Sequence, residues 1–367
     1  MNTRISRFQL AGLLGVSAMF TETANLPEAN SYDMWRFVSL LCTSAALLLL
    51  YLPMMVYSSK NGETGMLRVI TEKNRFIGWV FGIIIMLRLL YTAVLTFVQL
   101  EFFVTNTIMA YLSSAYITVI VFAAALYGIN KGIQATARLA PLALIILLLF
   151  IITVSIASWS SMSLLRLHSP IIHMRTGEFT LIKNDEIILF AIMLGLVRNK
   201  NNKGNAYKSV LLYLPIVLVM SLWLNFIFNT ILGRFLERTL YPLYTLSSFT
   251  YLALFERMDG IDVTVVIVMG LLKLIMTFVC VRIIISDLLF NNVKAEKAGR
   301  ITASSLLILT GLSGYFLLAR REWLLSPSLN IYFLVITITI AVIMPCTAAL
   351  INSRRSKNEI KSTSDNI

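Results

Sequence analysis

The chain has 367 residues, of which 58% are hydrophobic and 13% are charged, and its formal net charge is +13 at pH 7. Its mean hydropathy is +0.81. This composition excludes a soluble domain of ordinary type. It predicts an all-α polytopic membrane protein, because crossing a hydrocarbon core about 30 Å thick takes roughly 20 apolar residues and the sequence supplies such runs repeatedly.

We expect ten transmembrane helices in chain order. Two of the apolar runs are short and interrupted: 8–26, which holds several polar residues before Pro27, and 186–197, which ends near Gly195. Eight others are long and clear: 37–57, 77–103, 110–127, 139–157, 209–232, 263–285, 302–318 and 331–351. The segment 240–254 between two of these runs is apolar enough to lie along the membrane, as a lid over an outer vestibule or as an interfacial helix.

The two weak runs stand at positions one and six, and each precedes four strong ones. Transporters built from two five-helix inverted repeats, the LeuT-like arrangement, place their broken helices at such matching positions. We therefore expect one domain over 1–352, with repeats at about 8–160 and 185–352, and a basic cytoplasmic tail at 353–367. Unwound backbone near Gly15–Asn25 and Phe190–Gly195 is predicted to line the binding site.

A signal peptide is the alternative interpretation of the first run, because Arg4 and Arg7 precede its apolar core. No small-residue cleavage pattern follows this run, and counting it as a span gives ten spans, the number that two five-helix repeats require. Both points favour a transmembrane helix over a signal peptide. With both termini in the cytoplasm, 19 Lys and Arg residues fall in inner segments, nine in outer segments and three within spans. This excess on the inner side supports that orientation, and it attributes the positive charge to topology and contact with anionic lipid, without nucleic acid.

Charged residues within the spans are the first candidates for function. Lys273 lies inside a run that crosses the bilayer, where a charge costs about 2.5 to 3.5 kcal/mol and faces a partner or a cavity. Two alternatives remain: Lys273 pairs with a carboxylate such as Glu101 to hold helices together, and Arg88 lies near a helix end and reaches the interface. Including neighbours on the same helix face, the predicted ligand-binding residues are Gly15, Ser17, Thr21, Glu22, Arg88, Tyr91, Gly195, Lys273 and Thr277.

No enzymatic or metal chemistry is predicted. The three cysteines, Cys42, Cys280 and Cys346, fall inside spans and indicate small buried apolar residues, while His168 and His173 stand in an outer loop without a nearby cysteine. The sequence contains no phosphate-binding loop, nucleophile elbow or zinc-protease helix. We therefore expect no catalytic residues, no metal and no cofactor.

Several motifs carry a resemblance to a known family. They are Phe255-Glu256-Arg257-Met258-Asp259 after Pro242 and before Lys273, and Gly132-Ile133-Gln134 followed by Ala137-Arg138-Leu139. Gln9 and Pro27 at the ends of the first run, and the stretch Leu164–Pro170, fit as well. In these motifs, over about residues 5–352, the chain resembles the B subunit of bacterial spore germination nutrient receptors, a branch of the amino acid–polyamine–organocation transporter superfamily.

The resemblance implies a ten-span, broken-helix core in the spore inner membrane that senses a small nutrient of the amino acid or nucleoside class. It also implies receptor A and C subunits as partners. The first run departs from the family pattern, since Ser17–Glu22 is more polar than the glycine-rich stretch expected there, and this leaves the identity of the ligand open. Two other functions stay open: an amino acid permease coupled to an ion or proton, and an inert scaffold for the A subunit.

Overall fold

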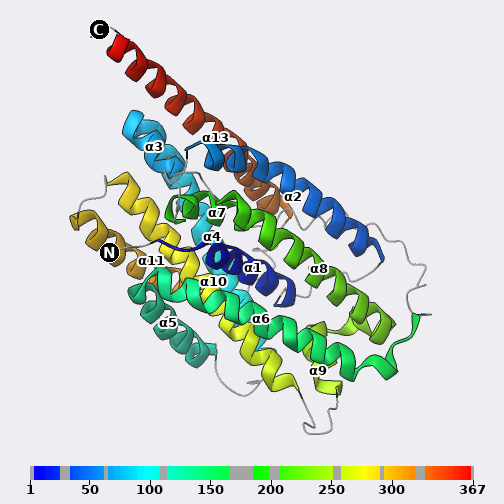
Figure 1. The fold of residues 1–367 in the computed structure, drawn as a ribbon. Coiled ribbons are helices and arrows are strands. Elements are labelled where there is room, and N and C mark those ends of the chain that lie inside the picture. Colours follow the sequence, from blue (N-terminus) through cyan, green and yellow to red (C-terminus); the bar gives the residue numbers. More distant parts are fainter. Residues whose placement is uncertain are drawn as a thin grey trace.

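The computed structural model describes residues 4–24, 34–61, 65–107, 114–164, 185–197, 206–250, 258–289, 293–318 and 327–364. Within these ranges the chain is helical, and the only β-type pairing is an isolated parallel bridge between Ile5 and Val197. The helices form one elongated bundle (Figure 1). An all-α fold is therefore confirmed for the described residues.

The first part of the chain, to residue 164, forms α1 (Arg7–Thr23), α2 (Met34–Asn61), α3 (Met66–Lys73), α4 (Arg75–Thr107), α5 (Ser114–Lys131) and α6 (Ile133–Ala157). From residue 185 the chain forms α7 (Glu186–Met193), α8 (Tyr207–Ile231), α9 (Pro242–Phe249), α10 (Asp259–Leu288), α11 (Val293–Leu318) and α13 (Pro327–Ser364). Each of the ten predicted runs coincides with one of these helices. The short helices α3 and α9 are additional, and α9 falls in the segment expected to lie along the membrane.

Six helices in the described part of the chain are long and apolar enough to cross a membrane. They lie within α2, α4, α6, α8, α10 and α13. Shorter apolar helices occur at Ala115–Lys131, Glu186–Leu196 and Ile301–Phe316. The multi-pass character predicted from composition is thus present in the structure.

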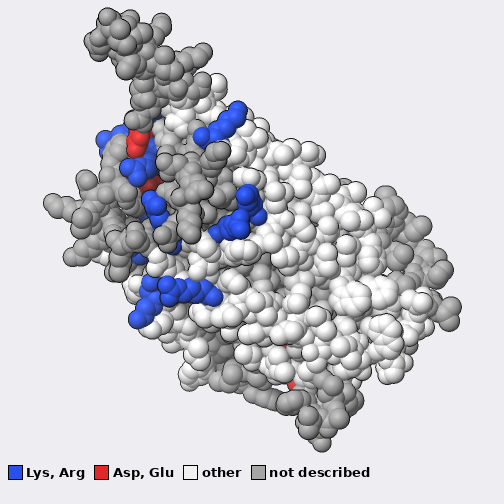
Figure 2. Space-filling model, in the orientation of Figure 1, with Lys and Arg blue, Asp and Glu red and all other residues white. Residues whose placement is uncertain are grey.

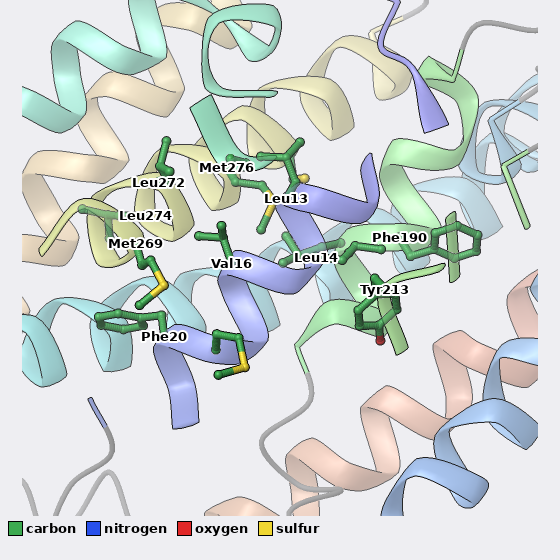
Figure 3. Packing of buried hydrophobic residues seen from close by; sticks show 14 of the residues in the cluster. Leu13, Leu14, Val16, Phe20, Phe190, Tyr213, Met269, Leu272, Leu274 and Met276 are labelled. Carbon is green, nitrogen blue, oxygen red and sulfur yellow. The ribbon is translucent and has the colours of Figure 1, made fainter. Parts of the chain in front are cut away.

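Helix α1 occupies the middle of the bundle and packs against α6, α8 and α10 (Figure 1). Leu10, Leu14, Met19 and Phe20 are fully buried, because apolar residues surround the helix on every side. Figure 3 shows Phe20 and Val16 of this helix beside Met269 of α10, with Phe190 of α7 and Tyr213 of α8 near Leu14. The first helix is therefore a core element of the fold.

The predicted unwinding of this helix is wrong over the described residues. Helix α1 is continuous from Arg7 to Thr23, and Ser6 caps its start with a reciprocal hydrogen bond to Gln9. Its polar residues fit within a regular helix because Thr21 and Thr23 donate their hydroxyls to the carbonyls of Ser17 and Met19, four residues back. Asn25 and Pro27, where the predicted break ended, lie outside the described residues.

The glycines of α1 allow close helix packing. A Cβ atom at Gly12 would lie 2.7 Å from Cγ of Pro141, and one at Gly15 would lie 2.6 Å from Cδ1 of Leu144, both on α6. Helix α6 itself begins after Gly132, whose φ of 84° requires a residue without a side chain at the turn from α5. These glycines set the spacing and the connection of α1, α5 and α6.

Helix α7 is short, and its α-helical geometry ends at Met193, where a 3-10 turn (Leu194–Leu196) follows. The backbone N–H of Ile5 donates to the carbonyl of Leu196 at 3.0 Å. The chain entering α1 is thus held against the end of α7. This contact places the two predicted weak runs side by side.

Basic residues mark one end of the bundle. On the face drawn in Figure 2, the Lys and Arg side chains gather at the end where the two chain termini lie in Figure 1, while the remaining described surface is nearly free of charge. Helix α13 continues past the bundle at that end, as far as Ser364. An apolar belt with a basic end agrees with the positive-inside pattern in the sequence.

Candidate functional site

A buried ion cluster lies at the start of α7, centred on Asp185. The carboxylate of Asp185 forms an ion pair with the guanidinium of Arg88 from α4, and Nζ of Lys273 from α10 lies 3.6 Å from its other oxygen. The side chains of Arg88 and Lys273 are each 2% exposed and that of Asp185 is 5% exposed. One carboxylate therefore balances two cations that would otherwise be buried without a partner.

Three helices determine this geometry. Helices α4 and α10 pack along each other, so Arg88 and Lys273, each near the middle of its helix, reach the same point between them. Asp185 is the residue directly before α7 and meets them there. Its negative charge also stands at the positive end of the α7 dipole. The cluster thus fixes the start of α7 to α4 and α10, which pack against each other.

Hydroxyl groups of α1 complete the cluster. Nζ of Lys273 donates to Oγ1 of Thr21 at 2.6 Å, and Oγ of Ser17, one turn earlier, donates to Oε1 of Glu186 at 2.8 Å. Both hydroxyls come from the same face of α1. Helix α1 is therefore linked to two consecutive carboxylates at the start of α7, Glu186 directly and Asp185 through Lys273.

Aromatic rings enclose Arg88 on the side of α13. Its guanidinium carbon lies 5.4 Å from the ring centroid of Tyr91 and 5.0 Å from that of Phe333, and the two rings stack at 3.9 Å. Arg88 also donates to Oγ1 of Thr92 at 2.8 Å. Cation–π contacts of this kind stabilise a desolvated guanidinium. The alternative that Arg88 lies near a helix end and reaches the interface is wrong.

A pocket opens beside the cluster, between α1, α2, α7 and α8. It has a cavity volume of about 90 Å³, where a single water needs roughly 10 to 15 Å³. Glu22 and Glu186 contribute carboxylates to its wall, and the carboxylate of Glu22 is ion-paired with Arg36. The remaining lining residues are Ala18, Thr21, Leu40, Thr43, Ser44, Leu47, Tyr213, Leu214, Val217, Leu218 and Ser221.

A pair of tyrosines stands at the α8 side of this pocket. The hydroxyl of Tyr213, a lining residue, lies 2.7 Å from that of Tyr51 on α2. Both side chains are buried, and Tyr51 also meets the ring of Phe190 edge-on, with centroids 5.5 Å apart. The hydrogen bond satisfies both phenols, as a buried tyrosine requires. It joins α2 to α8 directly beside the pocket.

Five of the nine predicted site residues lie close together in the structure. Ser17, Thr21, Arg88 and Lys273 belong to one hydrogen-bonded cluster, and Tyr91 touches it through the ring contact to Arg88. Their grouping was expected from the sequence, whereas a role in ligand binding remains a prediction.

Four predicted site residues lie apart from this cluster. Glu22 lines the pocket but is paired with Arg36, and Gly15 packs against Leu144. Gly195 lies in the 3-10 turn after α7. Thr277 is buried and donates its hydroxyl to the backbone carbonyl of Lys273 at 2.8 Å. The hydroxyl of Thr277 is thus satisfied within its own helix, which accounts for a polar residue at that position.

The sequence reasoning missed Asp185 and Glu186. Asp185 directly precedes the predicted run 186–197 and is not among the predicted site residues. Glu101, the suggested partner of Lys273, instead accepts from Thr118 at 3.4 Å through its Oε1, and Asp185 takes the ion pair. One signal was available. Two consecutive carboxylates stand at the start of an apolar run too short for a full crossing, in a chain whose other spans hold Arg88 and Lys273.

The described part of the chain holds no group of three or more His, Cys, Asp or Glu residues that could bind a metal. Cys280 is buried, whereas Cys42 and Cys346 are exposed on their helices rather than buried as predicted. An apolar helix surface at a lipid-facing position accounts for this difference. The two histidines, and Phe255, Glu256 and Arg257 of the motif before α10, lie outside the described residues.

A multi-pass helical bundle with a charged cluster buried between its helices defines a polytopic membrane protein. Comparison with protein families gives a more specific assignment: a family described as spore germination protein, of the spore permease type, matches residues 8–317. The chain belongs to this spore germination protein family. A comparison with curated proteins finds no match.

Proposed function

We propose that this chain is the membrane subunit of a spore germinant receptor, located in the spore inner membrane. It binds a small nutrient of the amino acid or nucleoside class and triggers germination together with receptor A and C subunits. It acts as a ligand-binding subunit and not as an enzyme. The buried cluster around Asp185 carries the proposal, because ionised groups at membrane depth are costly and face a partner, a substrate or an ion path.

The proposal includes a fold of two five-helix inverted repeats. Helices at corresponding positions contact one another, namely α1 with α7, α2 with α8, α4 with α10 and α5 with α11. Each contact between two helices should also recur between their counterparts in the other repeat. The contact of α1 with α6 has its counterpart in α7 with α13, and that of α4 with α11 in α10 with α5. A two-fold axis in the membrane plane would produce this pattern, and binding sites of such folds lie at the repeat interface.

The nutrient site in this proposal lies where α1 meets α7. That junction holds the cluster, the pocket and most of the predicted ligand-binding residues. It is also the junction of α1 and α7, which correspond to the two apolar runs that are shorter than ordinary spans. A ligand bound here would contact α1, α7 and α8 together and could change their relative positions, which is the response that a signalling subunit requires.

Proton-coupled transport is the second candidate function. Asp262, in the first turn of α10, is 1% exposed, and neither of its carboxylate oxygens has a hydrogen-bond partner among the described residues. Within the same part of the chain, Oε2 of Glu101 is likewise buried and without a partner. Proton relays through membranes use buried acidic groups.

One experiment tests the proposal and separates the two functions. Spores that lack the gene are exposed to single amino acids and nucleosides, and germination is followed for each. A receptor subunit predicts loss of the response to one nutrient class. Uptake of the same labelled nutrient by vesicles containing the full chain distinguishes the permease, which accumulates it. Unchanged germination with every nutrient would contradict the receptor function.

A further inference from the structure

The pocket between α1, α2, α7 and α8 contains a buried carboxylate that forms no ion pair with any described residue. Glu186 lines the pocket and is 1% exposed, and its carboxylate accepts a hydrogen bond from Ser17 at 2.8 Å. Lys273 attracts it electrostatically, but among the described residues no Lys, Arg or His lies within ion-pair distance of it. A buried charge in that state needs a partner, since leaving it unpaired costs several kcal/mol.

The neighbouring carboxylates do not share this property. Asp185 is held by both Arg88 and Lys273, and Glu22, another lining residue of the pocket, is paired with Arg36. Three carboxylates and three cations therefore lie at this junction, but the pairing is uneven, and Glu186 is the carboxylate without an ion pair among the described residues. Glu186 lines the pocket, whereas Asp185 is engaged with Arg88 of α4 and Lys273 of α10.

The other walls restrict what can bind. Six of the thirteen lining side chains are aliphatic, among them Leu40, Leu47 and Val217. The hydroxyls of Thr43, Ser44, Ser221 and Tyr213 are interspersed with them. A small metal ion prefers a shell of several carboxylate and carbonyl oxygens. Of the two lining carboxylates, Glu22 is already paired with Arg36, so Glu186 alone would be offered to such an ion. An organic cation fits better, because its charged end meets the carboxylate and its carbon skeleton meets the aliphatic wall.

We propose that this pocket binds a small aliphatic amine in its protonated form, with the carboxylate of Glu186 as the acceptor of the ammonium group. The inference rests on the proposed function, in that the chain binds a small nutrient, and it adds the recognition chemistry and the wall of the bundle on which recognition takes place. Ser17 is the positioning residue, because its hydroxyl donates to Oε1 of Glu186 and so fixes the carboxylate.

The test uses the full chain in lipid nanodiscs and four probes that differ in one feature each. L-Valine carries both an ammonium and a carboxylate, isobutylamine lacks the carboxylate, isovalerate lacks the ammonium, and potassium chloride supplies a cation without a carbon skeleton. Calorimetric titration is expected to show binding of L-valine and isobutylamine alone. Glu186→Gln keeps the shape of the side chain and its contact to Ser17. This variant is expected to bind L-valine and isobutylamine at least about tenfold more weakly than the wild type.

Glu72→Gln is the matched control, because Glu72 is exposed and does not line the pocket. The Glu72→Gln variant should bind both amines with wild-type affinity. A second variant, Val217→Phe, fills the pocket without touching a charge and should also weaken both amines. The inference is overturned if isovalerate binds as well as L-valine, if potassium alone binds, if the wild-type chain does not bind isobutylamine, or if either pocket variant keeps wild-type affinity.

The germination assay keeps the two claims separate. If spores without the gene lose a nutrient response while Glu186→Gln spores respond at the wild-type nutrient concentration, the amine pocket is wrong and the receptor function stands. If the amines bind as expected but the deletion leaves germination unchanged, the receptor function is wrong and the pocket stands.

Discussion

At the scale of single residues, Asp185 has the greatest influence on the site. It is the common partner of Arg88 and Lys273, and through Lys273 it also reaches Thr21 on α1. Four helices therefore meet through one carboxylate. The desolvation of three charges makes such a cluster a modest source of net stability, yet removal of one member leaves the others uncompensated.

We predict that Asp185→Asn destabilises the protein more than Lys273→Met. The asparagine leaves two buried cations without a counter-charge, so the free energy of unfolding should fall by about 3 to 5 kcal/mol. In Lys273→Met, Arg88 keeps its ion pair and the methionine fills the space of the lysine stem. The thermal unfolding midpoint and the abundance of each variant in the membrane measure the difference.

Arg68→Met is the control for these substitutions, because Arg68 and Glu72 form a half-exposed ion pair, one turn apart on α3. Exposed pairs contribute less than about 1 kcal/mol, so this variant should unfold like the wild type. An unfolding midpoint of Asp185→Asn equal to that of Arg68→Met would show that the cluster does not hold the helices together.

The residues of the site could be predicted only in part. Lys273 and Arg88 stand out in a sequence because charge is rare inside apolar runs, and Ser17 and Thr21 followed from their place in a short polar span. Asp185 could not be recognised in the same way. It stands before the helix and not within it, so only its position in space shows that it faces two cations.

At the scale of elements, α1 is a packed helix whose glycines serve contact with α6. The nearest atoms to a Cβ at Gly12 belong to the ring and backbone nitrogen of Pro141, whereas Gly15 faces the end of the Leu144 side chain. A proline ring cannot move away, but a leucine can change its rotamer. The two glycines therefore differ in how much space a substitution would find.

Gly12→Ala is accordingly predicted to destabilise the protein more than Gly15→Ala. Overpacking a tight contact costs about 1 to 3 kcal/mol, while alanine otherwise improves helix propensity by up to about 1 kcal/mol. Gly260→Ala serves as the control, since no atom lies within 4 Å of a Cβ built there. Thermal unfolding of the three variants should rank Gly12→Ala lowest and Gly260→Ala highest, and the reverse order would refute this account of α1.

The positions of the long helices could be predicted from the sequence, but the continuity of α1 could not. Long apolar runs identified every long helix because a span has to be apolar over its whole length. The polar residues of the first run suggested unwound backbone, but Thr21 and Thr23 bond to carbonyls of their own helix and Ser17 bonds to Glu186. Whether a polar side chain interrupts a helix depends on partners that the local sequence does not contain.

At the scale of the whole molecule, the distribution of charge sets the orientation in the membrane. Lys and Arg gather at the end of the bundle where both termini lie (Figures 1 and 2). The count of Lys and Arg in the loops predicts the same orientation, with both termini in the cytoplasm. This prediction needs the sequence alone, because the positive-inside rule depends on loop composition and not on tertiary contacts.

A reporter fused after Arg355 is therefore expected to lie in the cytoplasm, and one inserted at Thr176 is expected to lie outside. An accessibility assay with a membrane-impermeant label measures both, with a reporter at Lys60, in a predicted inner segment, as an internal standard. Labelling of the Arg355 fusion from outside would contradict the ten-span topology.

The central claim is that the cluster joining α1, α4, α7 and α10 belongs to the site through which a nutrient acts. The most direct test is the dependence of germination on nutrient concentration in spores that carry Lys273→Met, compared at equal membrane abundance with the wild type. Because the ammonium links Thr21 of α1 to Asp185 at the start of α7, the account predicts a response that needs more nutrient or is lost. An unchanged concentration dependence at equal abundance would contradict it.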